Sequence, residues 1–318
     1  MTIKANVDKL LRNSTETSVP VRYEGSNICT WIGFKHVNYV IEEAVLEHFR
    51  SNGLGARELY ERFGLGLDLT NLDTRIFSAL HTDDAATAVV IPSGDDDRLS
   101  FTVKLSVMRD GKATKAATAQ VDVHLRRGTY GFDTENDDGL LEPFAVESIA
   151  DSATTLDLPD LDLNGDIVQQ ATAGRNAFAW KWRIPYMYCH YNERVQMSGF
   201  LRQMEEAEDL FLADRGISIK TMLDDRRWIP VVPHSRIRLL NEAIMEEQLY
   251  TVYTIEQVFK TLTYTARMDC FVIRDNTIVP VATGSITHGY AVIDDRSNWT
   301  LVDFDERVMT ALTRGEKQ

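Results

Sequence analysis

Polar side chains that could handle protons and charge gather in a short loop near residue 190. His190, Asn192 and Arg194 lie within five residues of one another. An imidazole, whose unperturbed pKa is about 6.5, can accept a proton at neutral pH. A carboxamide can orient water or a carbonyl oxygen, and a guanidinium can bind a carboxylate. The loop therefore offers a base, a positioning group and an anion-binding group together.

The cysteines give little support for nucleophilic catalysis, disulfide bonding or metal binding. Cys189 precedes His190, but adjacent residues on a strand point to opposite faces, so we do not expect a nucleophile–base pair. The three cysteines are an odd number and form no CxxC pair, which predicts neither a disulfide framework nor a zinc site. Walker, GxGxxG and HExxH motifs are absent, so no nucleotide or metal site is expected.

The polar loop must be positioned by a helix that follows it, expected over residues 199–214, with Gly216 as its stop. A second helix is expected from Val37 to Arg50, where apolar residues keep a spacing of three to four. After each helix the pattern changes to strands. These are expected at residues 74–80, 85–92, 98–109 and 115–126, then at 228–240, 248–263, 266–274 and 277–294.

The two helix-and-strand sets are related by a constant offset. Glu42-Glu43-Ala44 recurs as Glu205-Glu206-Ala207, and Gly53 recurs as Gly216, both 163 residues later. Hairpin signals at Asp110-Gly111 and Asp275-Asn276 are 165 residues apart. A constant offset across a helix, its stop and a hairpin indicates internal duplication. We expect repeats at residues 17–130 and 176–313, joined by an acidic linker at 131–175 that is read as a solvated spacer.

The order of strand, loop, long helix, short helix and antiparallel meander resembles the hot-dog fold of acyl thioesterases, in the 4-hydroxybenzoyl-CoA thioesterase-like superfamily. The motif there runs Asp-x-x-Gly-His-Val-Asn-Asn-x-x-Tyr-Leu, followed by Glu-Glu-Ala. The resemblance implies an α+β protein with two tandem hot dogs, a double hot dog. Each would be a curled antiparallel sheet wrapped around a long central helix.

Alignment on Glu-Glu-Ala carries the motif onto both repeats. His190 falls at the family aspartate and Arg194 at its histidine. In the first repeat these positions are Asn27 and Trp31. In the tandem acyl-carrier-protein thioesterases of plants, which the chain also resembles, the first asparagine of the motif matches Asn192. Neither repeat keeps the aspartate, although some hot-dog thioesterases, including those of enediyne biosynthesis, have an asparagine there.

The resemblance also implies where the chemistry takes place. In hot-dog enzymes the thioester carbonyl lies at the N-terminus of the central helix, where backbone N–H groups can stabilise an oxyanion or an enolate. Those donors would come from residues 195–199 or 32–35. The expected catalytic residues are His190, Asn192 and Asn27. The expected substrate-binding residues are Tyr191, Arg194, Gly199, Trp31, Gly33, His234 and Arg236.

Simpler interpretations stand beside three of these assignments. His190 could be a loop histidine bonded to backbone, and Asn27 could form an Asx turn before a helix. His234 is expected on a strand, where a histidine is more often structural.

Three functions follow from the resemblance. The first is hydrolysis of an acyl thioester carried by coenzyme A or an acyl carrier protein. The second is conjugate addition of an amine such as glycine to an α,β-unsaturated thioester, as in natural-product biosynthesis. There Arg194 or Arg236 would hold the carboxylate of the amino acid. The third is a non-catalytic acyl-binding protein. None requires a cofactor beyond the CoA or phosphopantetheine of the substrate.

Composition narrows the possible partners. The 318 residues carry a formal net charge of −14, which argues against general nucleic-acid binding and against docking on an anionic membrane. The N-terminus lacks an apolar signal core, and no run approaches the roughly 20 apolar residues of a membrane span. We expect a cytoplasmic protein. Because the fusion supplies both hot dogs, a homodimer is possible but not required.

Overall fold

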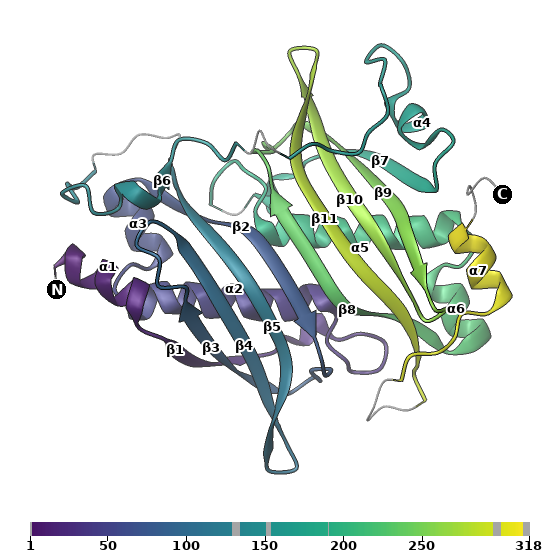
Figure 1. The fold of residues 1–318 in the computed structure, drawn as a ribbon, viewed down its shortest axis with the longest axis horizontal. Helices are drawn as coiled ribbons and strands as arrows, with labels where there is room; N and C mark the ends of the chain where they lie inside the picture. The colour runs from purple at the N-terminus through teal and green to yellow at the C-terminus, as the bar shows by residue number, and fades with distance from the viewer. Residues whose placement is uncertain (1, 129–133, 151–153, 190, 295–299, 314–318) are drawn as a thin grey trace. The chain divides into compact units, whose positions relative to one another are not determined.

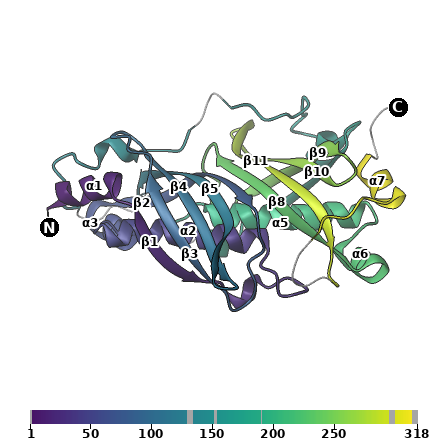
Figure 2. The ribbon, with the colours of Figure 1, turned by 60° about the horizontal axis from the view of Figure 1, so that its bottom comes forward.

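Two compact units make up the chain, Met1–Ile149 and Ala150–Gln318. The computed structural model describes residues 2–128, 134–150, 154–189, 191–294 and 300–313. In each unit a long helix crosses one face of an antiparallel sheet (Figures 1 and 2). The boundary between the units falls inside the expected linker.

The first unit has five antiparallel strands in the order β1-β3-β4-β5-β2 within its described residues. Its strands are β1 (Thr15–Pro20), β2 (Leu65–Ile76), β3 (Ala85–Pro92), β4 (Leu99–Arg109) and β5 (Lys112–Arg127), and short β6 (Ala145–Val146) joins β5 in parallel. Its helices are α1 (Ile3–Arg12), η1 (Tyr23–Gly25), the central α2 (Phe34–Ser51), α3 (Ala56–Phe63) and η2 (Glu142–Phe144).

The second unit repeats this plan with the order β8-β11-β10-β9-β7. Its strands are β7 (Ala177–Arg183), β8 (Trp228–Leu239), β9 (Gln248–Phe259), β10 (Thr263–Arg274) and β11 (Thr277–Val292). Its helices are α4 (Ile167–Thr172), η3 (Tyr186–Tyr188), the central α5 (Met197–Asp214), α6 (Ile219–Arg226) and α7 (Glu306–Thr313).

The core of each unit lies between the central helix and the sheet. On α2 the buried residues Val37, Ile41, Ala44 and Val45 recur at helical spacing, which gives the helix one apolar face. Buried and half-exposed residues alternate along β4, as expected for a strand with one face on the core. Burial of these facing apolar surfaces is the main source of stability.

The duplication is confirmed element by element. Both ends of α2, α3 and β2 are offset by 163 from those of α5, α6 and β8, and both ends of β5 are offset by 165 from those of β11. The register shift in β4 between Leu105 and Ser106 recurs in β10 between Cys270 and Phe271, again 165 residues later. Shared irregularities of register are inherited features rather than requirements of any helix-on-sheet packing.

An ion pair is also duplicated. Asp84 bonds Arg109 at 2.5 Å in the first unit, and Glu247 bonds Arg274 at 2.6 Å in the second. Each carboxylate also accepts the backbone N–H of the residue three positions before it, at 2.7 Å in both units. The pair therefore ties the start of β3 or β9 to the end of β4 or β10.

The hairpin predictions are confirmed. Asp110 and Gly111 both have positive φ, as do Asp275 and Asn276, which is the geometry of type I′ turns. The strand expected at residues 74–80, which follows the helices of the first repeat and corresponds to β2, was placed wrongly. It spans Leu65–Ile76 rather than residues 74–80, and it starts directly after Gly64, whose left-handed conformation ends α3.

The solvated-spacer interpretation of the linker is wrong for residues 154–172, which we call the linker strap. Its leucines pack on a buried cluster that includes Val252 and Phe271 of the sheet. Asp157 of the strap forms ion pairs with Arg175, at 2.7 Å, and with Arg267 of β10. The leucines that make these contacts are Leu156, Leu158, Leu161 and Leu163. Alternation of acidic and apolar residues therefore produced an amphipathic strap.

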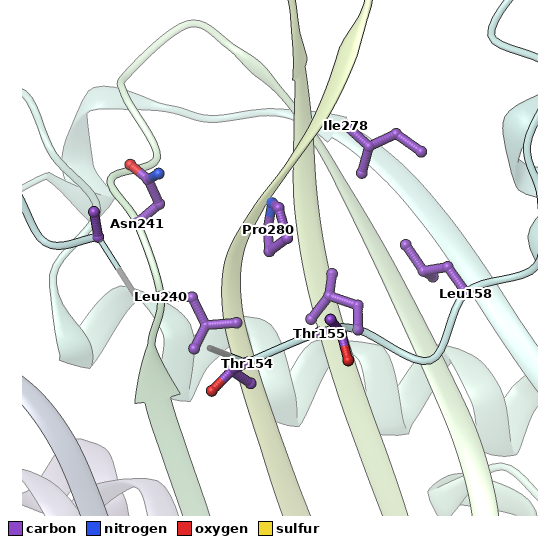
Figure 3. A pocket seen from close by; sticks show the side chains of 9 residues that line it. Thr154, Thr155, Leu158, Leu240, Asn241, Ile278 and Pro280 are labelled. Atoms are coloured by element: carbon purple, nitrogen blue, oxygen red, sulfur yellow. The ribbon is translucent and has the colours of Figure 1, made fainter. Parts of the chain in front are cut away.

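A cavity of about 420 Å³ lies where the strap crosses the end of the sheet (Figure 3). Leu156 and Leu158 line it from the strap, and Leu240, Ile278 and Pro280 line it from the sheet. None of its lining residues belongs to the loop before α5, so this cavity is separate from the predicted site.

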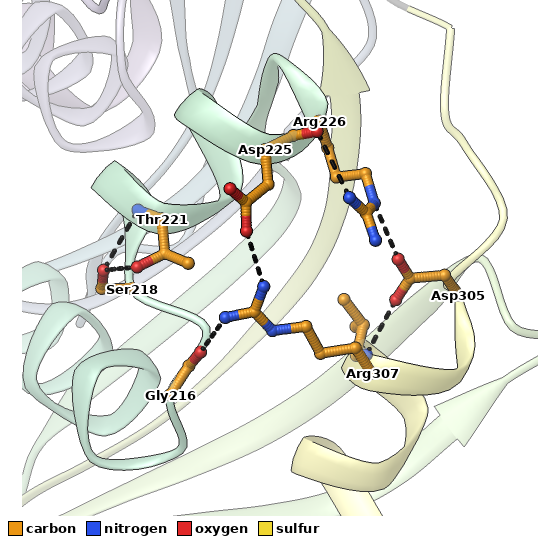
Figure 4. A network of polar contacts seen from close by, with 8 residues as sticks. Gly216, Ser218, Thr221, Asp225, Arg226, Asp305 and Arg307 are labelled. Carbon is orange, nitrogen blue, oxygen red and sulfur yellow. Dashed lines mark hydrogen bonds and ion pairs between the residues drawn. The ribbon is translucent and has the colours of Figure 1, made fainter.

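The C-terminal helix α7 is fastened to α6 by two arginines (Figure 4). Arg307 donates to Asp225 at 2.7 Å and to the Gly216 carbonyl at 2.8 Å. Arg226 donates to Asp305, which also accepts the Val308 N–H and so caps α7. Within the described residues, no helix has the length and apolar character needed to span a membrane.

Candidate functional site

The loop before α5 is held as if it were a short strand. Val195 donates its backbone N–H to the Ala243 carbonyl at 2.9 Å, and the Met245 N–H donates to the Glu193 carbonyl at 2.8 Å. Arg194 and Ile244 form the bridge between these two bonds. The backbone of residues 193–195 is therefore fixed, which sets the direction in which the chain enters α5.

Asn192 is buried, and its side chain braces the same loop. Its Oδ1 accepts the Arg194 backbone N–H and the Gln196 Nε2–H, both at 2.9 Å. A backbone N–H needs an acceptor, so these bonds fix which amide atom is oxygen. The Nδ2 of Asn192 is also buried, and it has no hydrogen-bond partner among the described residues. Asn192 thus presents a rigidly oriented and unused donor.

Most of the backbone N–H groups at the start of α5 already donate hydrogen bonds within the protein. Gln196 donates its N–H to the Tyr188 carbonyl at 3.2 Å, and Gly199 donates to the Gln196 carbonyl at 2.9 Å. Gln196 is the N-cap but makes no side-chain capping bond. The Met197 N–H, at the first position of the helix, makes no hydrogen bond within the described chain. A buried amide without a partner is unfavourable unless a ligand or water completes it.

Gly199 is required by a close contact rather than by backbone conformation. A Cβ there would lie 2.9 Å from the Tyr188 carbonyl oxygen and 2.8 Å from Val195 Cγ1. The first unit makes the same contact with the residues exchanged. There Gly25 occupies the position of Tyr188 and His36 that of Gly199, and a Cβ on Gly25 would lie 2.7 Å from His36 Cγ. In each repeat a ring on one partner packs against a glycine on the other.

The junction in the first unit is simpler than that in the second. Asn27 is exposed, and its Oδ1 accepts the N–H of Ile28 at 3.1 Å, a local turn contact. Trp31 is buried and pairs with His81 through the backbone. Gly33 is the N-cap of α2 and makes no side-chain capping bond. Cys29 occupies the position of Asn192, so this unit lacks a carboxamide at the position that Asn192 holds in the second.

The remaining predicted residues are dispersed. His190 lies outside the described residues, so its role stays a prediction. Tyr191 is exposed, whereas Arg194 is 3% exposed within the loop. Ile237 of β8 is paired with Gly284, whose Cβ would meet Met204 of α5, so Ile237 faces the helix. His234 and Arg236 therefore point to the opposite face of the sheet, away from α5.

One cysteine and one tyrosine lie next to the loop, and both are poor nucleophiles. Burial raises the pKa of the Cys189 thiol to about 11, so the thiolate is scarce at neutral pH. Burial, reinforced by the charge of Glu206, raises the pKa of Tyr188. Neither group adds a nucleophile to the site.

The sequence predicted backbone donors within residues 195–199 but did not single out the two residues that shape the helix entry. Gln196 was not considered, although the offset of 163 aligns it with Gly33 and marks it as the N-cap. Met197 lies within the predicted donor range, but its side chain alone indicates a core residue, because a backbone donor is not visible in the side-chain pattern. Both could have been found by taking the residues between Asn192 and Gly199 in register with the first repeat.

No protein-family model and no curated protein sequence matches the chain. Solved structures do match over nearly its whole length. A putative oleoyl thioesterase from Lactobacillus plantarum matches with a TM-score of 0.58 and 12% identity, covering 87% of this chain and 95% of that chain. The 12:0-ACP thioesterase from Umbellularia californica matches with a TM-score of 0.53 and 12% identity, covering 86% and 93%.

An acyl-ACP thioesterase from Bacteroides thetaiotaomicron matches with a TM-score of 0.51 and 11% identity, covering 91% of this chain and 100% of that chain. Agreement over both units, together with the duplicated helix-on-sheet plan, decides the architecture. The chain is a double hot dog. The expected α+β class and tandem arrangement are thus confirmed, and each central helix, α2 and α5, is the core helix of its own hot dog.

Proposed function

We propose that this double hot dog is an acyl thioesterase that hydrolyses a thioester carried by coenzyme A or an acyl carrier protein. The observation that carries the proposal is the pair of unused donors at the start of α5. The Met197 N–H and the Asn192 Nδ2 are both buried, and both lack partners among the described residues. Two such donors, with the positive end of the helix dipole, suit a developing oxyanion.

The reaction follows from this arrangement. Water adds to the thioester carbonyl, and the two donors stabilise the negative charge that forms on the carbonyl oxygen. His190 accepts the proton from the water and returns it to the sulfur as the carbon–sulfur bond breaks. The products are the free acid and the thiol. The only cofactor-like group in this scheme belongs to the substrate.

The second hot dog is the better candidate for the active half. In the first, the Phe34 N–H is also the first amide of the helix, but Cys29 replaces the carboxamide donor. Asn27 uses its side-chain oxygen on its own neighbour in an exposed turn. We therefore assign oxyanion stabilisation to α5 and a structural role to the loop before α2.

Conjugate addition of glycine could use the same donors to stabilise an enolate. It also needs a guanidinium for the amino-acid carboxylate. Arg194 is buried within the loop, and Arg236 lies on the sheet face opposite α5. These positions weigh against an amino-acid clamp, so hydrolysis is the function we favour.

One assay separates the alternatives. The full chain is incubated with dodecanoyl-CoA or crotonyl-CoA, with and without glycine, while thiol release and product mass are followed. Thiol release from dodecanoyl-CoA is expected, and His190→Ala should abolish most of it. A mass gain that needs both crotonyl-CoA and glycine would replace hydrolysis by addition. Acyl binding without either reaction would favour a non-catalytic protein.

A further inference from the structure

Five polar side chains lie together in the interior of the second hot dog, between α5 and the sheet. They are Glu208 of α5, Tyr253 of β9, Tyr264 of β10, and His288 and Tyr290 of β11. Each is at most 4% exposed. His288 Nδ1 lies 2.8 Å from Glu208 Oε1, and the Tyr264 ring stacks on the His288 ring at 5.1 Å. We call these five residues the interior polar cluster.

The interior polar cluster is short of hydrogen bonds. The Glu208 and His288 atoms approach closely, but not with the geometry of a hydrogen bond. The Tyr253 and Tyr264 side chains interact with each other. Their hydroxyls, the Tyr290 hydroxyl and His288 Nε2 nevertheless have no partner of normal hydrogen-bond geometry among the described residues. Buried polar groups in folded proteins are nearly always paired with protein, water or ligand. The cluster is therefore an incomplete set of donors and acceptors.

The fold does not require polar residues at these positions. By the offsets of 163 for α2 and β3 and 165 for β4 and β5, the first hot dog has apolar residues at all five. These are Val45, Val90, Leu99, Val123 and Leu125, and every one is buried. His48, a buried histidine on the central helix of the first hot dog, has both ring nitrogens bonded, to Thr15 and to the Leu10 carbonyl. Among the described residues, the second hot dog is therefore polar at five positions where the first is apolar.

One stripe of α5 connects the cluster to the predicted reaction centre. Met197, Leu201, Met204 and Glu208 are spaced by four, three and four residues, and all are buried. Glu208 lies eleven residues beyond Met197, a rise of about 16 Å along the helix. Methionine is flexible and fills irregular space, so a wall containing Met197 and Met204 can rearrange around a chain. An extended acyl group of medium length spans that distance.

The donor and acceptor types select the group that would complete the cluster. An ammonium ion accepts no hydrogen bond and would leave the tyrosine and histidine donors unpaired. A carboxylate would face the Glu208 carboxyl group. A hydroxyl group can donate to Glu208 Oε1 and accept from a tyrosine O–H or from His288, which suits both kinds of atom.

We propose that the interior polar cluster recognises a hydroxyl group at the distal end of the acyl chain, so that the second hot dog acts on hydroxylated acyl thioesters. The inference rests on the proposed thioesterase function, since it places the thioester carbonyl at the start of α5. It adds a substrate class and assigns specificity to residues about three turns away from the reaction.

The test compares two substrates that differ only in the terminal hydroxyl group. The kcat/KM of the full chain is measured on ω-hydroxydodecanoyl-CoA and on dodecanoyl-CoA. The wild type should prefer the hydroxylated substrate by about tenfold, the effect expected of one or two net hydrogen bonds. The triple variant Tyr253→Phe/Tyr264→Phe/Tyr290→Phe keeps the rings but removes three hydroxyls, and its ratio should fall to about one.

The matched control is Tyr250→Phe, which removes a hydroxyl from β9 on the face that packs under the linker strap. Its ratio should equal that of the wild type. Tyr264→Phe alone serves if the triple variant does not fold, and it should lower the ratio in part. A wild-type ratio near one, or a ratio that the triple variant preserves, overturns the proposal. Either result means that water alone completes the cluster.

Binding gives a readout that does not depend on catalysis. The rise in Tm caused by ω-hydroxydodecanoic acid is compared with that caused by dodecanoic acid, in the wild type and the triple variant. If neither thioester is hydrolysed but the hydroxy acid stabilises the wild type more than the variant, the thioesterase proposal fails and the hydroxyl site stands. Equal shifts for the two acids in the wild type overturn the hydroxyl site, whatever the activity.

Discussion

The oxygen and the nitrogen of the Asn192 carboxamide have different roles. The oxygen holds the loop through Arg194 and Gln196, and the nitrogen is left for a ligand. The sequence predicted that Asn192 would matter, because of its type and its place before the helix. It left open whether the residue orients water or the thioester oxygen, and the occupied side-chain oxygen leaves only donation from the nitrogen. Only coordinates can separate the two, since both roles use the same residue.

Asn192→Asp separates these two roles. An aspartate keeps an oxygen to accept both loop bonds but cannot donate, so the fold should persist. The kcat for thioester hydrolysis should fall on the order of 100-fold, the usual effect of losing one oxyanion donor. Circular dichroism and thermal melting verify folding beside the kinetics. An unchanged kcat would remove Asn192 Nδ2 from the oxyanion site.

His48 should make the stability of the first hot dog depend on pH. Burial lowers its pKa below 6.5, partly offset by the bond to the Leu10 carbonyl. A lowered pKa in the folded state stabilises the protein above pH 6.5, and that stability is lost as the pH falls through the folded value.

Urea unfolding at pH 7.5 and 5.5 tests this dependence. His48→Phe introduces the residue that the second hot dog has at this position, Phe211. The variant should lose less stability between the two pH values than the wild type. Some dependence should remain, because burial also lowers the pKa of His81 and His124. Equal losses in wild type and variant would show that His48 does not contribute.

Among the secondary-structure elements, sequence patterns succeeded where one face of a strand is buried. They predicted both hairpins and the helix after each loop. They failed at the start of β2, whose first six residues are all buried. A strand buried on both faces loses the period of two that marks a strand in the sequence. The duplicated ion pairs were also missed, since each joins strands through residues 25 or 27 positions apart.

The ion pairs tie neighbouring strands, and we expect both to act in the same way. Burial alone would raise the pKa of Asp84 and of Glu247, but the bonds from Arg109 and Arg274 lower both below their ordinary values. Carboxylates with lowered pKa values add stability above their unfolded values, 3.8 and 4.5, which is lost as the pH falls through the folded ones.

Arg109→Gln and Arg274→Gln should each lower the free energy of unfolding at pH 7 by about 1 kcal/mol, because both pairs are partly solvent-screened. The difference from wild type should shrink as the pH approaches 3. Chemical denaturation across this range tests both variants. A deficit that stays constant with pH would mean that lost packing, rather than charge, causes it.

At the scale of the whole molecule, the sequence predicted two repeats and an acidic segment between them. It could not show that the acidic segment is structural. The acidic residues dominate the composition, whereas the contacts depend on alternate leucines that lie on the second sheet. An amphipathic segment becomes buried only if another part of the chain offers an apolar surface for it to pack on. The composition of the segment itself gives no information about that surface.

Leu158→Ser/Leu161→Ser tests the linker strap in the full chain. Loss of two partly buried leucines should lower the free energy of unfolding of the second hot dog by about 2 kcal/mol. Asp160→Ser, at an exposed strap position, is the control and should change stability little. Stability can be followed by urea unfolding and by limited proteolysis of the strap. A double variant as stable as the control would restore the spacer interpretation.

The exchanged ring and glycine at the two helix entries constrain how the halves can be recombined. A chimera that joins the loop carrying Tyr188 to the helix carrying His36 would force two rings into space that holds one. The reverse chimera would pair Gly25 with Gly199 and leave a void. Each loop is thus compatible only with its own helix. In evolution or in engineering, loop and helix must be inherited together, so each entry behaves as one indivisible module.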